Sequence, residues 1–297
     1  MENHARIADK VAMNKNLPIH DAIAPLIAAL RDHGRAVLQA PPGAGKTTVV
    51  PLEMLHAGLT KGRILMLEPR RLAARAAAER MAHTLNERPG QTVGYRVRGD
   101  AKISKSTQIE VVTEGILTRM IQSDPELTGV GAVIFDEFHE RSLNADLGLA
   151  LCLEIAGALR DDLILLAMSA TLDAEPVAKL MGAAPVITSQ GRSFLVETRW
   201  LDRPVPKQAR YETALADLVI RAVSETEGGV LVFLPGEGEI RRVEALLQGR
   251  LPEDCQIRPL FGAMDFARQR AAIAPAAVGR KIVLATSIAE TSLTIED

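Results

Sequence analysis

The sequence is poor in aromatic residues and in cysteine, and it has no long apolar run. Aromatic residues make up 3% of the chain, whereas Ala, Leu, Ile and Val are plentiful, which favours aliphatic α/β packing over an aromatic-rich β-sandwich. No apolar stretch reaches the ~18 residues needed to span a bilayer, so we predict no membrane association. Cys152 and Cys255 lie far apart, with no CxxC pair and no histidine spaced for zinc. We therefore expect two buried thiols in a reduced cytoplasm and no zinc site.

An excess of either charge is also lacking. The 35 Lys and Arg residues are balanced by 37 Asp and Glu residues, which gives a formal net charge of −2. This balance excludes a protein that is basic throughout, but it leaves room for a local basic strip that binds nucleic acid. Residues 61–80 form such a strip, because six basic and two acidic residues give them a local charge of +4.

The remaining composition is that of an ordinary globular protein. Hydrophobic residues make up 47% and charged residues 24%, which excludes a disordered or collagen-like chain. A length of 297 residues favours two domains, at about 150 residues per domain. Residues 1–16 contain no apolar signal-peptide core and are predicted to form a flexible leader.

Short aliphatic runs alternate with longer Ala- and Leu-rich runs along most of the chain. This alternation predicts parallel strands joined by crossover helices, with helices on both faces of each sheet. The strands predicted in the first half are residues 36–39, 64–67, 107–112, 130–136 and 163–168, and the helices include 71–85 and 145–160. Two prolines in residues 201–206 predict a linker. The alternation then restarts, with helices at 211–225, 237–248 and 265–273 and strands at 230–234, 255–260 and 281–285, so we expect domains at 17–200 and 207–297.

Residues 40–48 (APPGAGKTT) lie between the first predicted strand and a helix, which is the order of a phosphate-binding P-loop, although Ala40 stands where the simplest pattern has Gly. Two glycines let the backbone curl so that its N–H groups point at phosphate oxygens, and the N-terminus of the following helix favours negative charge. Lys46 is expected to reach the β- and γ-phosphates of ATP, and Thr47 to bind Mg²⁺ through its hydroxyl. The predicted nucleotide-binding residues of the loop are Gly43, Ala44, Gly45, Lys46, Thr47 and Thr48.

Two acidic residues follow the apolar strand predicted at residues 130–136. Asp136 and Glu137 would stand at the carboxyl end of a parallel strand, where sheets of this kind bind ligands. We expect Asp136 to hold Mg²⁺ through water, and Glu137 to orient and deprotonate the water that attacks the γ-phosphate. His139 favours a hydrogen-bonding role over a metal-binding one, because no partner ligands are spaced for a metal.

Beyond a generic nucleotide-binding pattern, several segments resemble the motifs of superfamily 2 helicases. Residues 136–139 (DEFH) resemble the DEAH box, with Phe where Ala is usual. Further segments are similar to motif Ia (68–74, EPRRLAA), motif Ib (113–115, TEG), the SAT motif (169–171), motif IV (233–240) and motif V (285–296). The stretch at 94–100 (GYRVRGD), together with the Pro-Pro P-loop, is most similar to the bacterial HrpB branch. From about residue 17 onward, the chain therefore resembles DEAH-box RNA helicases.

This resemblance implies two tandem RecA-like domains and a 3′→5′ ATP-dependent RNA helicase or translocase that uses Mg²⁺. It implies that Arg80 lies against the adenine and that Ser292 and Glu296 touch the ribose. The residues expected to couple the nucleotide and RNA faces are His139, Ser169 and Thr171, and Thr291 is expected to contact RNA.

The segments similar to motifs Ia and Ib also carry groups that suit RNA phosphates. Arg70 and Arg71 are expected at a strand-to-helix turn, where they would hold single-stranded RNA in a sequence-independent, salt-sensitive way. Thr113, Glu114 and Gly115 open another helix, and the backbone N–H groups there also suit phosphate. Arg75 is expected on a solvated helix face. DNA is a less expected partner than RNA.

One motif of the family has no counterpart in this sequence. Motif VI, which supplies arginine fingers, would follow motif V, and the second domain is shorter than a full RecA-like unit. We therefore expect a truncated second domain and slow ATP hydrolysis, because arginine fingers contribute about 10³ to 10⁵ in rate in related phosphoryl transfers. Two alternatives stay open, a non-enzymatic module that binds ATP and RNA and a DNA translocase of the same superfamily. A metabolic kinase is disfavoured, because it would not need the motifs of the second half.

Overall fold

The computed structural model describes residues 17–170, 174–191, 195–201, 203–206, 210–276, 278–290 and 295. The chain divides into two compact units, Met1–Phe194 and Leu195–Asp297, and each is considered by itself. The domain boundaries expected from the sequence stay predictions, and the leader predicted at residues 1–16 lies outside the described residues.

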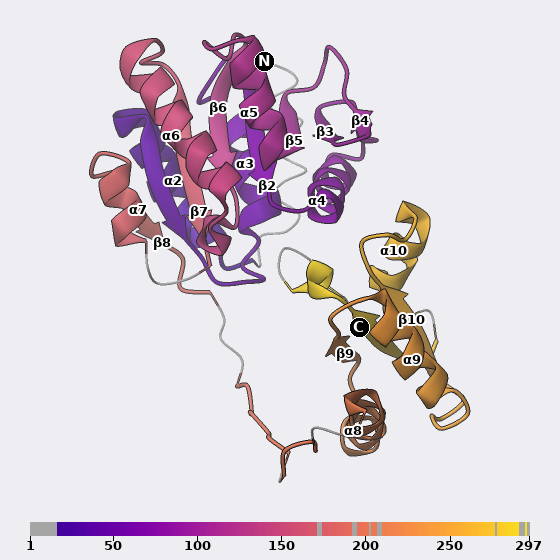
Figure 1. Cartoon of the computed structure of the whole chain (residues 1–297). Coiled ribbons are helices and arrows are strands. Elements are labelled where there is room, and N and C mark those ends of the chain that lie inside the picture. Colours follow the sequence, from indigo (N-terminus) through magenta and orange to yellow (C-terminus); the bar gives the residue numbers. More distant parts are fainter. Residues whose placement is uncertain are drawn as a thin grey trace. The chain divides into compact units, whose positions relative to one another are not determined.

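The first unit is built on one eight-stranded sheet with the order β4-β3-β5-β2-β6-β7-β1-β8 (Figure 1). Its strands are β1 (Arg35–Gln39), β2 (Arg63–Glu68), β3 (Val93–Val97), β4 (Asp100–Lys102), β5 (Ile109–Thr113), β6 (Val130–Phe135), β7 (Ile164–Ser169) and β8 (Val186–Thr188). Neighbouring strands are parallel, apart from the β3–β4 pair, which is an antiparallel hairpin. The predicted parallel sheet is thus confirmed, with one antiparallel strand at its edge.

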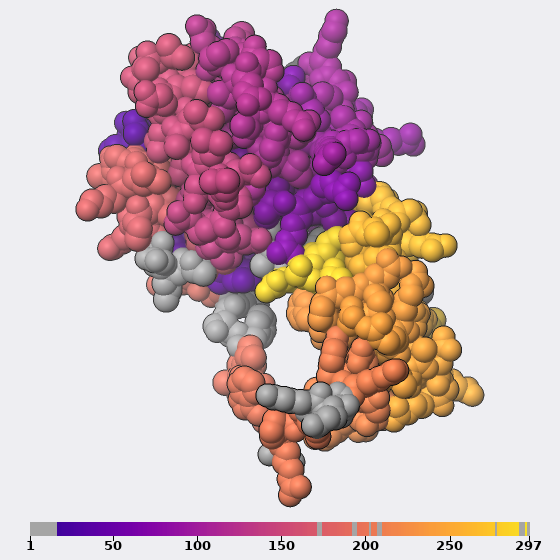
Figure 2. All heavy atoms as spheres, viewed as in Figure 1, coloured from indigo at the N-terminus to yellow at the C-terminus, as the bar shows by residue number. Residues whose placement is uncertain are grey.

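Helices cover both faces of this sheet (Figure 1). They are α2 (His20–His33), α3 (Lys46–His56), α4 (Arg71–Thr84), α5 (Glu114–Ser123), α6 (Leu143–Ala158) and α7 (Glu175–Leu180). Every residue of β6 is buried. Ala132 and Ile134 belong to the core with α2, α3 and α4, whereas Val133 and Phe135 belong to the core with α5, α6 and α7. A strand that is apolar on both faces therefore needs helices on both sides, as the sequence predicted. Figure 2 shows one such face, where α5 and α6 (magenta to pink) form the outer layer.

The topology decides which loops meet. Because parallel strands all run the same way, the loops that follow β1, β2, β5, β6 and β7 leave the sheet at the same edge. In the strand order β6 lies between β2 and β7, with β5 beyond β2 and β1 beyond β7. The loop after β6 is therefore central at this edge.

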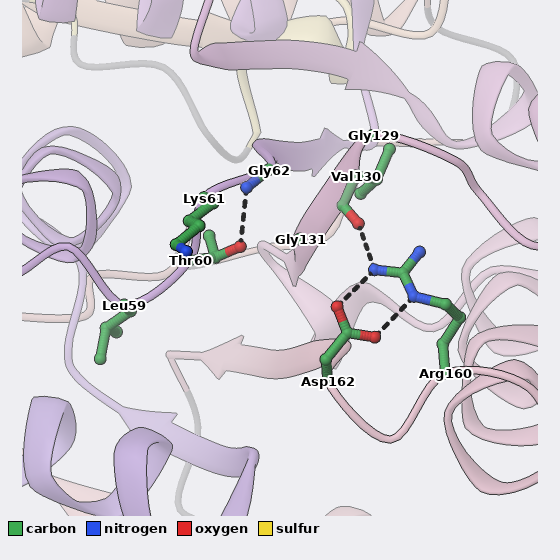
Figure 3. Close-up of a pocket in the computed structure, with 9 residues that line it drawn as sticks. All are labelled: Leu59, Thr60, Lys61, Gly62, Gly129, Val130, Gly131, Arg160 and Asp162. Atoms are coloured by element: carbon green, nitrogen blue, oxygen red, sulfur yellow. Dashed lines mark hydrogen bonds and ion pairs between the residues drawn. The ribbon is translucent and has the colours of Figure 1, made fainter.

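The opposite edge of the sheet has a hollow of about 430 Å³ (Figure 3). Two of its loops approach closely, because a Cβ on Gly131 would lie 1.7 Å from Thr60 Oγ1. The guanidinium of Arg160 binds both carboxylate oxygens of Asp162 and donates to the carbonyl of Val130. The charges of Arg160 and Asp162 are therefore matched within the protein.

The second unit has a three-stranded parallel sheet with the order β10-β11-β9. Its elements are α8 (Tyr211–Glu225), β9 (Val230–Phe233), α9 (Glu237–Leu247), β10 (Cys255–Leu260), α10 (Phe266–Ile273) and β11 (Arg280–Ala285). A core of its own joins Val219 of α8 and Val243 of α9 to Ile282 of β11. On β9, Leu231 and Phe233 are 41% and 50% exposed, so this sheet is only partly covered.

Most predicted elements are confirmed within two residues at each end, and α8 and β10 have the predicted bounds. The sequence reading did not anticipate α2, the β3–β4 hairpin, α7 or β8. In the described part of the chain, no helix is both long and apolar enough to cross a membrane.

Candidate functional site

The loop after β1 has the backbone of a phosphate cradle. Gly43 and Gly45 have φ angles of 75° and 98°, in the left-handed region that glycine adopts without strain. A Cβ at Gly45 would lie 2.9 Å from Leu17 Cδ1, so this loop also packs tightly against the residues before α2. Lys46 begins α3 directly after Gly45. The positive end of the helix dipole therefore adds to the N–H groups of the loop as an attraction for anions.

The acidic end of β6 lies against this loop. Lys46 Nζ donates to Glu137 Oε1 at 2.7 Å, and Thr47 Oγ1 donates to Asp136 Oδ2 at 2.6 Å. The backbone N–H of Glu137 donates to Asp136 Oδ1 at 2.8 Å, so both oxygens of the Asp136 carboxylate are held. The two motifs come together because β1 and β6 are both neighbours of β7. The structure thus places the two predicted motifs side by side, and the role of each side chain stays a prediction.

The rest of the predicted loop residues surround these contacts. Ala44 is buried and Thr48 is half-buried, and Ala40 donates its N–H to the carbonyl of Ser169 at 3.0 Å. The base of the loop is therefore fixed to the end of β7, where the SAT-like segment begins.

Three carboxyl groups share this buried region with one ammonium group. Lys46, Asp136 and Glu137 are 5 to 8% exposed, and Glu68 at the end of β2 is fully buried. Burial raises the pKa of Glu137, and the Asp136 carboxylate adds to this rise. Burial likewise raises the pKa of Glu68 well above its ordinary value, with Asp136 again adding to it. Burial alone would lower the pKa of Lys46, but the carboxylates of Asp136 and Glu137 outweigh it and leave that pKa raised.

Glu137 has a backbone conformation that is unusual for its residue type. Its φ and ψ are 50° and 34°, in the left-handed region, which costs a non-glycine residue about 1 to 3 kcal/mol. The chain turns sharply here, directly after β6, and begins the short 3₁₀ turn Phe138–Glu140. Strained backbones of this kind gather at functional sites, so the turn agrees with a site at this position.

His139 joins the acidic end of β6 to the end of β7. The backbone N–H of Ala170 donates to His139 Nδ1 at 3.3 Å, and His139 Nε2 lies 3.4 Å from Glu137 Oε2. The imidazole therefore lies between Glu137 and the SAT-like segment, where a coupling group is expected. Ser169 is buried at the end of β7, and Thr171 lies outside the described residues.

The residues predicted to contact RNA lie after β2 and β5, at the same edge of the sheet. Arg70 precedes α4 with an extended backbone and pairs with Glu140 at 3.3 Å, and Arg71 is exposed at the first position of α4. Thr113 precedes α5, and Glu114 begins that helix. Thr113 and Glu114 are half-buried and Gly115 is exposed. Both segments thus open helices, as the sequence predicted.

The sequence does not predict the contacts of three further residues at this edge. It indicates Glu68 only as the start of a motif, yet the pairing of β2 with β6 brings Glu68 beside Asp136. It predicts no role for Glu140 or Ser142, yet Glu140 pairs with Arg70, and Ser142 Oγ donates to Glu114 Oε2 at 2.5 Å. Nothing in the linear sequence reveals these contacts, because they depend on the strand order.

The other residues singled out in the sequence lie partly outside the candidate site or outside the described residues. Arg80 is exposed on α4, and its adenine contact stays a prediction. Thr291, Ser292 and Glu296 lie outside the described residues. The expectation for Arg75 was wrong, because its side chain is only 16% exposed, pairs with Asp100 at 2.8 Å, and lies with its guanidinium carbon 5.8 Å from the centre of the Tyr95 ring.

The donor set fits Mg²⁺ bound together with phosphates. Thr47 and Asp136 offer a hydroxyl and a carboxylate, which are oxygen ligands of the kind that Mg²⁺ prefers. Within the described residues, no group of three or more His, Cys, Asp or Glu side chains is arranged to hold a metal ion by itself. Phosphate and water oxygens would therefore complete the coordination, as is usual for Mg²⁺ in nucleotide sites.

Comparison with known proteins adds to this geometry. Residues 18–180 match the DEAD/DEAH box helicase family. The chain is 53% identical over 283 residues to the ATP-dependent RNA helicase HrpB of Escherichia coli K12, which covers 95% of this chain and 35% of that protein. It is 37% identical over 286 residues to the ATP-dependent RNA helicase HrpA of the same strain, covering 94% of this chain and 22% of that protein. The chain therefore spans about a third or less of the length of these relatives.

Solved structures show the same likeness. The crystal structure of Escherichia coli DEAH/RHA helicase HrpB matches with a TM-score of 0.88 and 52% identity, over 95% of this chain and 36% of that one. A crystal structure of E. coli DExH-box NTPase HrpB matches with a TM-score of 0.79, also at 52% identity, over 94% of this chain and 34% of that one. The expected α/β fold of the RecA-like kind, with a partial second sheet, is confirmed, as is the resemblance to HrpB.

Proposed function

The chain belongs to the DEAD/DEAH box helicase family, and on this premise we propose that it binds ATP with Mg²⁺ and uses ATP hydrolysis to move 3′→5′ along single-stranded RNA. The observation that carries the proposal is the pair of contacts Lys46–Glu137 and Thr47–Asp136. They bring a phosphate-binding loop and two acids to one place, which is what hydrolysis of a nucleoside triphosphate requires.

Each of these residues has a distinct task in this proposal. The N–H groups of Gly43, Gly45 and the first turn of α3 hold the phosphates, and Lys46 donates to phosphate oxygens in place of Glu137. Thr47 and Asp136 hold Mg²⁺, which when bound neutralises the charge of the β- and γ-phosphates. The Glu137 carboxylate orients the attacking water and accepts its proton. Its raised pKa supports this task, because a general base works best with a pKa nearer to the working pH.

The RNA would bind over the loops after β2 and β5. Arg71 and the helix N-termini at Thr113 to Gly115 would hold its phosphates, which makes the affinity dependent on salt and largely independent of sequence. His139 and Ser169 would link this binding to the nucleotide site. The relatives are named RNA helicases, which supports RNA over DNA as the partner.

We further propose that a polypeptide of these 297 residues hydrolyses ATP slowly. Residues 281–297, which include the motif-V-like segment, contain no arginine that could act as an arginine finger. Such a finger contributes about 10³ to 10⁵ in rate in related systems. The same observation favours, as a second candidate function, a module that binds ATP and RNA without turnover. Cys152 is buried and Cys255 is half-buried, so the expectation of two buried thiols was wrong for Cys255. We further propose a cytoplasmic location, where thiols stay reduced.

A direct test measures binding and turnover separately. A fluorescent ATP analogue should bind in the presence of Mg²⁺, and single-stranded RNA should stimulate hydrolysis more than DNA of the same sequence. We expect a turnover number well below the ~10 s⁻¹ that is typical of enzymes. Binding without any turnover would support the second candidate, equal stimulation by DNA would favour a DNA translocase, and absence of nucleotide binding would overturn the proposal. Displacement from duplexes with a 3′ or a 5′ overhang tests the direction.

A further inference from the structure

One short segment contacts the loops that follow four other strands. This segment, Asp136–Ser142, joins β6 to α6, and we call it the β6–α6 segment. Its partners lie in the loops or in the first helical turns that follow β1, β7, β2 and β5. Because β6 is central in the strand order, its loop can reach the loops on both sides of it.

The first half of the segment contacts the nucleotide side. Asp136 and Glu137 bind the P-loop residues Thr47 and Lys46, and His139 binds the N–H of Ala170. These contacts lie in the site already proposed for ATP and Mg²⁺.

The second half of the segment contacts the side proposed for RNA. Glu140 Oε2 lies 3.3 Å from Arg70 Nη2, and the two side chains are 20% and 23% exposed. Ser142 Oγ donates to Glu114 Oε2 at 2.5 Å and also accepts from the N–H of Ala145 at 2.9 Å, which caps the N-terminus of α6. Glu140 therefore forms an ion pair with Arg70, an arginine that the proposed function assigns to RNA phosphate. Ser142 forms a hydrogen bond with Glu114, the first residue of α5.

The backbone between these halves is short and tightly turned. Glu137 and Arg141 have φ angles of 50° and 45°, on either side of the 3₁₀ turn Phe138–Glu140. Arg141 is held in turn by Asp146 at 3.0 Å. Only Phe138 and His139 separate Glu137 from Glu140, so the contacts on the two sides start from a segment of a few residues.

We propose that Glu140 and Ser142 are positioning residues that make the binding of nucleotide and of RNA interdependent, through Arg70 and Glu114. This inference rests on the proposed function. When Lys46 turns from Glu137 to a phosphate, the β6–α6 segment loses a buried contact, and its hold on Arg70 and Glu114 loosens. Arg70 then becomes available to RNA phosphate. Nucleotide and RNA therefore strengthen each other's binding, and linkage requires the two effects to be equal in size.

The test measures this coupling in the 297-residue chain. Fluorescence anisotropy gives the Kd of a labelled single-stranded RNA with and without a non-hydrolysable ATP analogue and Mg²⁺, and the reverse titration gives the Kd of the analogue with and without RNA. We expect the analogue to tighten RNA binding by about 5-fold or more, which is the lower end of ordinary allosteric coupling. Neither readout needs hydrolysis.

Glu140→Gln tests the first contact. Its neutral side chain should release Arg70, so that RNA binding without nucleotide approaches the affinity that the parent chain reaches with the analogue. The coupling factor should then fall to about 1. A merely structural role would weaken RNA binding or leave it unchanged, and either result would overturn the role of Glu140.

Ser142→Asp tests the second contact, with Ser142→Thr as its matched control. Asp keeps the cap of α6 but sets a negative charge beside Glu114, whereas Thr keeps both the cap and the donor. We expect Asp to reduce the coupling factor to within about 2-fold of 1, with the analogue's Kd in the absence of RNA unchanged, and Thr to restore the parent value. Parent-like coupling in Ser142→Asp, or a parent chain that binds both ligands without coupling, contradicts the inference. A parent chain that fails to bind one of the ligands contradicts the proposed function instead.

Discussion

The two sides of the β6–α6 segment hold their partners in different surroundings. On the nucleotide side, Lys46 and Glu137 form an ion pair whose members are 5% and 8% exposed. On the side proposed for RNA, Arg70 and Glu140 form a longer pair whose members are 23% and 20% exposed. A charge pair gains more from its attraction where water is scarce, but breaking it there leaves a buried charge without a partner. The buried Lys46–Glu137 pair therefore breaks only when a ligand offers Lys46 a negative charge in place of Glu137. The half-exposed Arg70–Glu140 pair can exchange partners at little cost in free energy.

This contrast predicts that changes on the two sides have separable effects. Substitutions on the nucleotide side should alter ATP binding or hydrolysis by large factors, and should affect RNA binding only through the smaller coupling factor. Substitutions on the other side should alter RNA binding by small, salt-dependent factors. The predictions that follow run from the largest expected effect to the smallest.

Glu137→Gln should have the largest effect. The amide cannot accept the proton of the attacking water, so the single-turnover hydrolysis rate should fall by about 10² to 10⁴, the usual contribution of a general base. ATP affinity should stay within about 3-fold, because binding relies on the loop and Mg²⁺ ligands. Rapid-quench measurements check the rate, and Glu154→Gln on the exposed part of α6 is the matched control. A parallel loss of RNA affinity would break the separation of the two sides.

Lys46→Ala should weaken ATP binding itself. Loss of a charged hydrogen bond to phosphate costs about 1.5 to 3 kcal/mol, which corresponds to roughly 10- to 150-fold in affinity. The control is Lys61→Ala, which removes an exposed lysine at the opposite edge of the same sheet. Titration with a fluorescent ATP analogue measures both variants. Equal affinity in Lys46→Ala and the parent chain would mean that the P-loop assignment is wrong.

The features of the fold and of the candidate site that depend on a local sequence pattern could be predicted from the sequence. Alternating strands and helices, the glycines of the P-loop and the acids after β6 are each visible within a few residues. The meeting of Lys46 with Glu137 was also predictable, because parallel strands deliver their following loops to one edge of the sheet.

What escaped prediction depends on which strands are neighbours. Glu68 lies beside Asp136 only because β2 pairs with β6, and Ser142 reaches Glu114 only because β5 lies next to β2. The prediction that Arg75 lies on a solvated helix face was wrong for a related reason. Its partners Asp100 and Tyr95 belong to the β3–β4 hairpin, which the sequence pattern does not predict. Contacts of this kind follow from the order of strands, which periodicity does not reveal.

Glu68→Gln should change the pH dependence of stability. Burial raises the pKa of Glu68 well above its ordinary value, so folding favours its neutral form. The contribution of Glu68 to the free energy of unfolding is then fully present below its ordinary pKa of about 4.3, and it is lost as the pH rises through the raised pKa. A glutamine stays neutral, so the variant should exceed the parent chain by about 1 to 3 kcal/mol at the alkaline end, the usual cost of a poorly satisfied buried group.

Urea denaturation of both chains across this pH range measures the difference. The gap should be small at about pH 5 and widen toward about pH 8, and the exposed Glu154→Gln should show no such trend. A gap that narrows with rising pH would mean that Glu68 is held as a stabilised carboxylate. In that case the buried nucleotide side would hold a further ionised carboxylate beside Asp136 and Glu137.

Arg71→Gln should have the smallest effect, on RNA alone. The side chain is exposed at the first position of α4, so its contact with phosphate is screened by water and salt. We expect the Kd for single-stranded RNA to rise by about 3- to 10-fold, and the slope of log affinity against log salt to shrink by about 0.7, which is one phosphate contact. Arg31→Gln removes the same charge from an exposed position on α2 and should change neither quantity. If both variants weaken RNA binding equally, the affinity depends on net charge and not on the loops after β2 and β5. A loss of RNA affinity confined to Arg71→Gln, with ATP binding intact, would sharpen the division between the buried and the exposed side.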